Sequence, residues 1–137
     1  MPMERIVASA KSACAHNFIK TLPGGYEMML SKGAENLSQG ERQLLTIARA
    51  LASDPEIMIL DEATSNVDTH TELLIQRAMA ELMKGRTSFV IAHRLSTIRD
   101  ADMILYMEDG DIKEVGTHEE LIKKQGKYAN LYFSQFE

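Results

Sequence analysis

The fold is decided by residues 57–68, IMILDEATSNVD. The first four residues of this stretch form a continuous apolar run between turn signals, which is typical of a strand buried on both faces. Two carboxylates, Asp61 and Glu62, follow the run directly. In open parallel sheets, ligands bind outside the carboxyl ends of the strands, so the acidic pair is expected at a binding edge.

Helical patterns flank this strand on both sides. Upstream, apolar residues recur at i, i+3, i+4 and i+7 from Leu44 to Leu51, and Asp54-Pro55 ends the segment. Downstream, residues 70–83 return to the helical period, and Lys84-Gly85 supplies a cation and a C-cap glycine. We therefore expect one helix before the strand and another after it.

A second short, buried strand is expected at residues 87–92, TSFVIA, with His93 just past its end. The order strand, helix, strand predicts a parallel pair joined by a crossover helix. Asp61, Glu62 and His93 then stand at two neighbouring strand ends.

The outer segments complete a mixed α/β layout. Helical spacing predicts a helix over residues 3–18, ended by the breaker LPGG at 22–25. Residues 103–107 and 112–115 look like two further strands, and the Asp-Gly between them favours an antiparallel hairpin. The tail, residues 127–136, suits a short packing helix.

Length, charge and cysteine content narrow the class of protein. The chain has 137 residues, of which 45% are hydrophobic, enough for one core of ordinary size. A formal charge of −5 without a cluster of Lys or Arg gives little reason to expect nucleic acid as the main partner. The single cysteine, Cys14, and the lack of a recognisable secretory signal predict a reducing cytoplasmic setting. The apolar runs fall far short of the roughly 20 residues that span a bilayer.

The strand-end side chains suit a site for magnesium and phosphate, because Mg²⁺ is held by one or two carboxylates together with substrate oxygens. In this interpretation Asp61 lies near Mg²⁺, Glu62 orients or deprotonates an attacking water, and His93 hydrogen-bonds a terminal phosphate. The simpler interpretation has the acids capping the next turn and the histidine meeting solvent. The placement of all three residues at strand ends favours the first.

The upstream helix begins with Ser38 to Glu41, SQGE. This is the spacing of a capping box, in which Ser38 accepts from the amide of Glu41 and Glu41 reaches back, and capping alone would explain the serine. It does not explain Gly40, because glycine there costs up to about 1 kcal/mol relative to alanine unless something must approach the backbone closely. Helix N-termini with a glycine bind phosphate well, so Gly40 indicates that the cap faces a ligand.

These stretches together resemble a known family. LSQGE at 37–41, IMILDEATSNVD at 57–68 and HR at 93–94 are similar, in this order and spacing, to the ATP-binding cassette domain of ABC transporters. The resemblance covers nearly the whole chain. It identifies residues 37–41 with the family's signature motif, residues 57–61 with its Walker B strand and residues 65–68 with its D-loop.

The resemblance implies a fold and a set of site residues. The fold is a partial P-loop NTPase fold of the α/β class: part of the helical subdomain at residues 1–52, then the C-terminal part of the catalytic core at 53–137. The core is expected as a mainly parallel sheet with flanking helices and a C-terminal β-hairpin. The implied catalytic residues are Glu62 and His93, the implied metal ligand is Asp61, and the implied ATP contacts are Ser38, Gln39, Gly40, Glu41 and Asp68.

The resemblance also implies an activity, ATP hydrolysis with Mg²⁺ that drives transport. In the family two cassettes pair head to tail, so the signature motif of one contacts the terminal phosphate of ATP held by the other. The stretches FIKTLPGGYEMML and ADMILYMEDGDIKEVGTHEELI look most like cassettes of multidrug, lipid or peptide exporters. The expected partners are a second cassette and a transporter membrane domain at the cytoplasmic face of the cell membrane.

Two departures from the family pattern matter. The phosphate-cradling loop G-x-x-x-x-G-K-[ST] is absent from the chain, since the only Gly-Lys pair, Gly126-Lys127, is followed by tyrosine. We therefore expect the C-terminal portion of a cassette, with little or no ATP binding and negligible hydrolysis by itself. Ser31 and Lys32 stand where exporter cassettes often carry a glycine and a glutamate that face the membrane domain.

Other interpretations stay open. The chain could be a non-enzymatic module that offers Ser38 and Gly40 to a complete partner cassette. A DNA-repair or chromosome-condensing ATPase also carries a signature motif and a Walker B strand, but no heptad run precedes the signature here. A sheet without its N-terminal strands would expose apolar faces, so association or poor solubility is expected. The transported substrate is not encoded in these residues.

Overall fold

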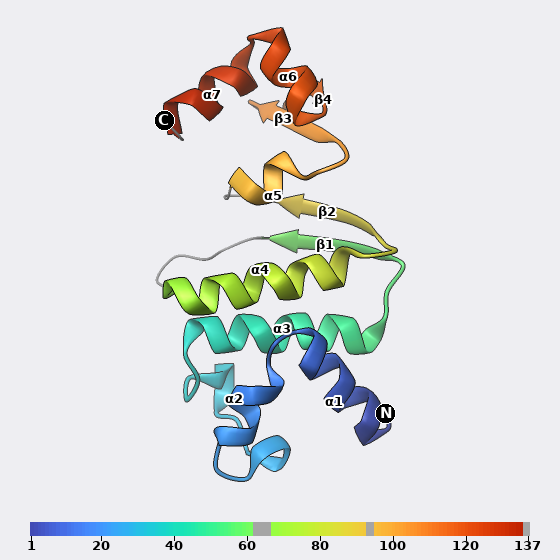
Figure 1. The fold of residues 1–137 in the computed structure, drawn as a ribbon, viewed down its shortest axis with the longest axis vertical. Coiled ribbons are helices and arrows are strands. Elements are labelled where there is room, and N and C mark those ends of the chain that lie inside the picture. Colours follow the sequence, from blue (N-terminus) through green and yellow to red (C-terminus); the bar gives the residue numbers. More distant parts are fainter. Residues whose placement is uncertain (62–66, 93–94, 136–137) are drawn as a thin grey trace. The chain divides into compact units, whose positions relative to one another are not determined.

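A computed structural model describes residues 1–61, 67–92 and 95–135. Its elements are α1 (Met3–Ser12), α2 (His16–Thr21), the 3-10 helices η1 (Gly25–Glu27) and η2 (Lys32–Ala34), α3 (Gln39–Ser53), β1 (Ile57–Asp61), α4 (Thr69–Met83), β2 (Thr87–Ile91), α5 (Leu95–Arg99), β3 (Ile104–Glu108), β4 (Asp111–Gly116), α6 (His118–Lys124) and α7 (Lys127–Gln135). The chain divides into two compact units (Figure 1). The first unit holds α1 to α4 with most of β1 and β2, and the second holds α5 to α7 with β3 and β4.

The N-terminal segment contains two helices, so the prediction of one continuous helix over residues 3–18 is wrong. Between α1 and α2, Cys14 adopts a left-handed conformation with φ 58°. The N–H of Ala15 donates to the carbonyl of Ala10 (2.7 Å) and so closes the last turn of α1. The apolar pattern continues across the break because Ala13 and Ala15 are both fully buried.

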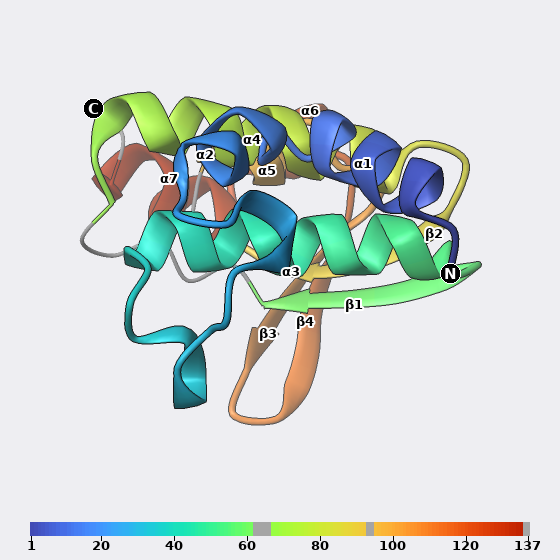
Figure 2. The ribbon, with the colours of Figure 1, turned by 90° about the horizontal axis from the view of Figure 1, so that it is seen from below.

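Helices α3 and α4 supply much of the core of the first unit. Their buried residues lie on one stripe each, Gly40, Leu44, Ile47 and Ala48 on α3 and Ile75, Ala78, Met79 and Leu82 on α4. Figures 1 and 2 show the two helices side by side, with both N-termini at the same end. The apolar faces predicted from the helical period are confirmed.

Strands β1 and β2 are hydrogen-bonded neighbours, and Figure 1 shows their arrows pointing the same way. This agrees with the predicted parallel pair with α4 as the crossover helix. The prediction that residues 57–60 are buried on both faces is wrong, and so is the prediction of a buried strand at residues 87–92. Met58 is 6% exposed, whereas Ile57, Ile59 and Phe89 are 65%, 76% and 57% exposed. One face of this sheet is therefore open within the described part of the first unit.

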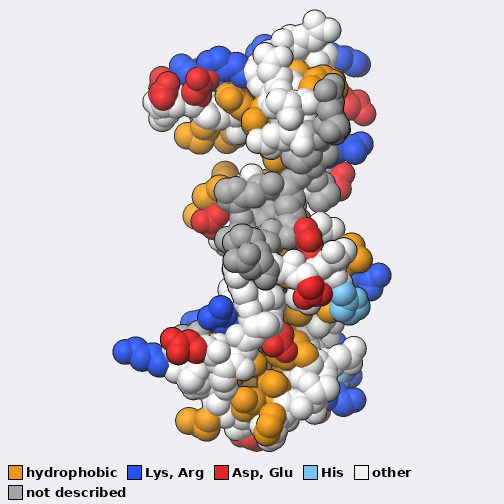
Figure 3. Space-filling model, turned by 90° about the vertical axis from the view of Figure 1, so that its left-hand side faces the viewer, with side chains coloured by type: hydrophobic (Ala, Val, Ile, Leu, Met, Phe, Trp, Pro, Cys, Tyr) orange, Lys and Arg blue, Asp and Glu red, His pale blue; other side chains and the backbone are white. Residues whose placement is uncertain are grey.

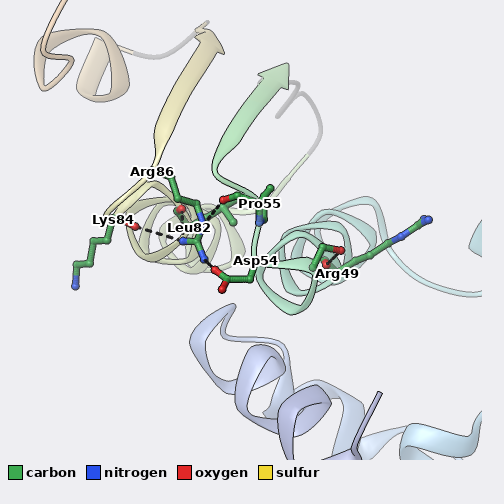
Figure 4. A network of polar contacts seen from close by, with 7 residues as sticks. Arg49, Asp54, Pro55, Leu82, Lys84 and Arg86 are labelled. Carbon is green, nitrogen blue, oxygen red and sulfur yellow. Dashed lines mark hydrogen bonds and ion pairs between the residues drawn. The ribbon is translucent and has the colours of Figure 1, made fainter.

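Arg86, just before β2, ties the ends of both long helices to the start of β1 (Figure 4). Its guanidinium donates to Asp54 Oδ1 (2.7 Å), to the Pro55 carbonyl (3.1 Å) and to the Leu82 carbonyl (2.8 Å). The side chain is only 14% exposed. A planar fork of donors suits several acceptors at once, which is why arginine fits this position better than lysine would.

The second unit is built on the predicted hairpin. β3 and β4 pair antiparallel, and the turn residues Asp109 and Gly110 both have positive φ, 51° and 80°, as a type I′ turn requires. Ile104, Leu121 and Tyr128 form a small core between the hairpin, α6 and α7. Within the part of the chain that is described, no helix is both long and apolar enough to cross a bilayer.

Candidate functional site

The N-terminus of α3 carries the predicted capping box. Ser38 Oγ accepts from the N–H of Glu41 (3.2 Å), and Glu41 Oε1 accepts from the N–H of Ser38 (3.0 Å). Ser38 is exposed and Gln39 is half-buried. The first amides of an α-helix have no carbonyl partner within the helix, and the helix dipole places partial positive charge there. This turn can therefore receive an anion through Ser38 and the amide of Gln39.

Gly40 is buried, and the structure supplies an intramolecular reason for glycine at this position. A Cβ added to Gly40 would overlap Thr71 Cγ2 and would lie 3.3 Å from Val67 Cγ1. The group that must approach the backbone closely is thus the start of α4. Phosphate binding is not needed to explain Gly40, because the close packing of α3 on the start of α4 already requires glycine there.

Sequence reasoning missed Thr71 and Val67 as contacts of residues 38–41, which we call the signature turn. A signal was present in the spacing, because Gly40 and Leu44 are separated by one helical step of four residues. Gly40 is the first member of the buried stripe of α3, and Thr71 stands four residues before Ile75 on the buried stripe of α4.

Asp68, predicted as an ATP contact, is the N-cap of α4. Its Oδ2 accepts from the N–H of Thr71 (3.0 Å). The backbone hydrogen bond from Thr71, followed by the one from the Thr71 hydroxyl, holds the pKa of the Asp68 carboxyl below its ordinary value. The carboxylate is exposed, and its ionised form also suits the positive end of the helix dipole.

The strand-end residues are described only in part. Asp61 is the last residue of β1 and is exposed, as predicted for a strand end. Glu62 and His93 lie outside the described residues. Among residues 1–61, 67–92 and 95–135, no group of three or more His, Cys, Asp and Glu side chains could hold a metal ion. Of the two predicted strand-end acids, only Asp61 lies among the described residues, and Mg²⁺ in proteins is commonly held by one or two carboxylates with phosphate and water as its other ligands.

The first unit brings two of the predicted groups together. Residues 38–41 begin α3 and residues 67–71 lead into α4, and the two turns touch at Gly40 and Thr71. Both helices are 15 residues long, so two positive dipole ends lie side by side. The arrangement favours negative charge beside these turns.

Comparison with known proteins assigns the family. A sequence model of the ABC transporter family matches residues 2–65. The chain is 56% identical over 128 residues to the fatty acid ABC transporter ATP-binding/permease protein of Mycobacterium tuberculosis, covering 93% of this chain and 20% of that protein. The chain belongs to the ATP-binding proteins of the ABC transporters. The family predicted from the three motifs is confirmed.

Two further relatives support the assignment. This ABC cassette chain is 53% identical over 133 residues to the ATP-dependent lipid A-core flippase of Hahella chejuensis, covering 97% of this chain and 23% of the flippase. A bacterial Atm1-family ABC exporter solved with ATP bound has a TM-score of 0.87 at 40% identity, over 99% of this chain and 24% of the exporter chain. The chain spans about a fifth of the length of the curated relatives that it matches.

Proposed function

We propose that this chain is the C-terminal part of an exporter-type cassette that binds and hydrolyses ATP to drive transport across a membrane. Residues 1–52 would be part of the helical subdomain and residues 53–137 part of the catalytic core. The observation that carries the proposal is the exposed, capped N-terminus of α3 in a chain 53% identical to an ATP-dependent flippase.

The signature turn would act on a second cassette. Ser38 presents its hydroxyl at an exposed helix start, and the amide of Gln39 adds a donor, so the turn can stabilise the terminal phosphate of ATP held by a partner in a head-to-tail dimer. Gly40 and Glu41 would support this turn, Gly40 through its fit to α4 and Glu41 through the capping box. Asp68, at the start of α4, would stand close to the same phosphate.

The strand-end residues would serve the chemistry of hydrolysis. Mg²⁺ would neutralise charge on the phosphates, and Asp61 at the end of β1 would hold the ion. Glu62 would orient the attacking water or take its proton, and His93 would hydrogen-bond the terminal phosphate, as the family resemblance implies.

The membrane domain would meet the segment between α2 and α3 on the cytoplasmic side of the membrane. Met29 and Leu30 are 87% and 46% exposed there, and Figure 3 shows hydrophobic side chains gathered at that end of the first unit. Ser31 and Asn36 hold the segment as a loop, since the hydroxyl of Ser31 donates to Asn36 Oδ1 (3.1 Å) and accepts from the N–H of Asn36 (3.3 Å).

A chimera tests the proposal. The matching segment of the Hahella chejuensis flippase is replaced by this chain, and Mg²⁺-dependent ATP turnover is measured. We expect turnover comparable with that of the parent, and a loss of about 100-fold or more in Glu62→Gln, because general bases contribute factors of this size. Glu119→Gln, the same change at an exposed position of α6, should have no effect. Turnover that persists in Glu62→Gln would refute the proposal.

A comparison of two helix-capping residues tests whether Ser38 binds phosphate or only caps α3. Ser38→Ala removes the cap of α3 and Thr117→Ala removes the equivalent cap of α6, and each costs about 1 kcal/mol of helix stability. Only Ser38→Ala should also lower ATP turnover of the chimera, by about tenfold or more, because it removes a phosphate donor. Equal turnover in both variants would leave Ser38 a cap and nothing else.

The isolated chain, outside the chimera, is expected to behave differently. Because it contains no G-x-x-x-x-G-K-[ST] loop, we propose that it does not hydrolyse ATP alone and acts only with a complete partner. Purified chain should show no Mg²⁺-dependent turnover above that of its own Glu62→Gln variant.

A further inference from the structure

The contact between Gly40 and Thr71 joins the first turn of α3 to the first turn of α4. Gly40 opens the buried stripe of α3, and Thr71 stands one helical step of four residues before Ile75 on α4. Thr71 Cγ2 occupies the space in which a side chain at position 40 would lie, and Val67 Cγ1 would lie 3.3 Å from an added Cβ. The first turn of α3 therefore rests on the first turn of α4 without room for another methyl group.

The two polar groups of Thr71 are engaged elsewhere. Its N–H donates to Asp68 Oδ2 (3.0 Å), and its hydroxyl also hydrogen-bonds the Asp68 carboxyl. Thr71 thus contacts Asp68 through its backbone N–H and its hydroxyl, and Gly40 through its methyl group.

From this geometry we propose that Thr71 is a positioning residue for the phosphate-facing turn 38–41: its methyl group sets the first turn of α3 while its N–H and hydroxyl hold Asp68. As a consequence, a shift of Asp68, the N-cap of α4, is coupled to a shift of the signature turn. This inference rests on the proposed function for its relation to ATP, but the contact itself can be tested in the chain alone.

Two substitutions separate the methyl group from the hydroxyl. Thr71→Ser keeps the hydroxyl and loses the methyl group, whereas Thr71→Val keeps a methyl group and loses the hydroxyl. Serine, threonine and valine have similar helix propensities, so neither change alters α4 much by itself. Amide hydrogen exchange is measured in the purified chain at Glu41 and Arg42, whose N–H groups donate to the hydroxyl and the carbonyl of Ser38. Thr71→Ser should speed exchange about two- to tenfold, the range that loss of one buried methyl group gives, and Thr71→Val should not.

The control is Thr69→Ser, the same loss of a methyl group from an exposed position in the first turn of α4. Exchange at Glu41 and Arg42 should not change in this variant. If Thr71→Ser leaves exchange at these two residues unchanged, or if Thr71→Val speeds it as much, the methyl group does not position the turn and the inference is wrong.

A double substitution tests the same contact from the other side. Gly40→Ala places a methyl group on Thr71 Cγ2, so the first turn of α3 must shift and its amides should exchange faster. Thr71→Ala removes that obstacle, so the double variant Gly40→Ala with Thr71→Ala should exchange more slowly at Glu41 and Arg42 than Gly40→Ala alone. No relief in the double variant would overturn the inference.

The positioning role has a readout in turnover. In the flippase chimera, Thr71→Ser should lower ATP turnover at saturating ATP by about two- to tenfold, in step with the exchange of the turn, and Thr69→Ser should not. Turnover unchanged by Thr71→Ser would show that the contact only stabilises the fold. If Glu62→Gln fails to abolish turnover, the proposed function falls, and the exchange measurements still decide the contact.

Discussion

Asp68 shows at the scale of one residue how a predicted ligand contact can also be structural. Its carboxylate accepts from the N–H and hydroxyl of Thr71, and these hydrogen bonds lower its pKa. A lowered pKa in the folded state means that the ionised form stabilises the fold. This contribution is complete above the pKa of an unfolded aspartate, about 3.9, and is lost as the pH falls through the lower pKa of the folded chain.

We therefore predict that Asp68→Asn changes the acid dependence of stability. Asparagine also caps helices but carries no charge, so at neutral pH the variant should be less stable than the wild type only by the part of the wild-type stability that titrates below about pH 4. Urea unfolding at several pH values should show the two proteins converging as the pH falls. Asp102→Asn, the same change at an exposed turn position, should follow the wild type. Parallel curves for Asp68→Asn and wild type would contradict this account.

At the scale of the element, the N-terminus of α7 depends on Glu114 of β4. Glu114 is only 6% exposed, and its Oε2 accepts from the N–H groups of Lys127 (2.7 Å) and Tyr128 (3.2 Å). A Cβ added to Gly126 would lie 2.8 Å from Glu114 Oε1. Glycine precedes α7 because the carboxylate fills the space beside it.

Removal of this carboxylate should loosen α7. Glu114→Ala leaves two amides without their acceptor and should lower the free energy of opening of α7 by about 1–3 kcal/mol. Glu114→Gln keeps an acceptor oxygen and should cost less, whereas Gly126→Ala should resemble Glu114→Ala because it displaces the carboxylate. Hydrogen exchange at Lys127 and Tyr128 measures the effect. Equal exchange in Glu114→Ala and Glu114→Gln would show that the cap is unimportant.

The same scale explains which elements could be predicted from sequence. α3 and the hairpin were predictable because their signals are local: the capping box at Ser38 and the Asp-Gly turn at 109–110. The break at Cys14 was not, because buried alanines continue the apolar pattern across it. The fit of Gly40 to Thr71 was missed because it joins positions 31 residues apart, and the helical period alone does not say what the stripe packs against.

At the scale of the whole molecule, the open apolar face of β1 and β2 is the feature that decides whether the chain associates. Met58 points into the first unit, whereas Ile57, Ile59 and Phe89 are more than half exposed on the other side. A continuous apolar run predicts a strand covered on both faces, but a run of four residues does not show whether the second cover lies within the same chain. Adjacent exposed apolar side chains of this kind mark a surface that is covered in an assembly or that causes association.

We predict that the isolated chain associates through this face. Ile59→Thr with Phe89→Thr keeps residues that favour strands while making the face more polar. It should raise the apparent dissociation constant by about tenfold or more, because burial of one such side chain is worth about 1.5–3 kcal/mol. Sedimentation velocity over a range of concentrations measures the effect. Leu73→Gln, which removes a 53% exposed leucine from α4 instead, should leave association unchanged. A wild-type chain that stays monomeric at tens of micromolar, where burial of this size would drive self-association, would show that the open face alone does not cause it.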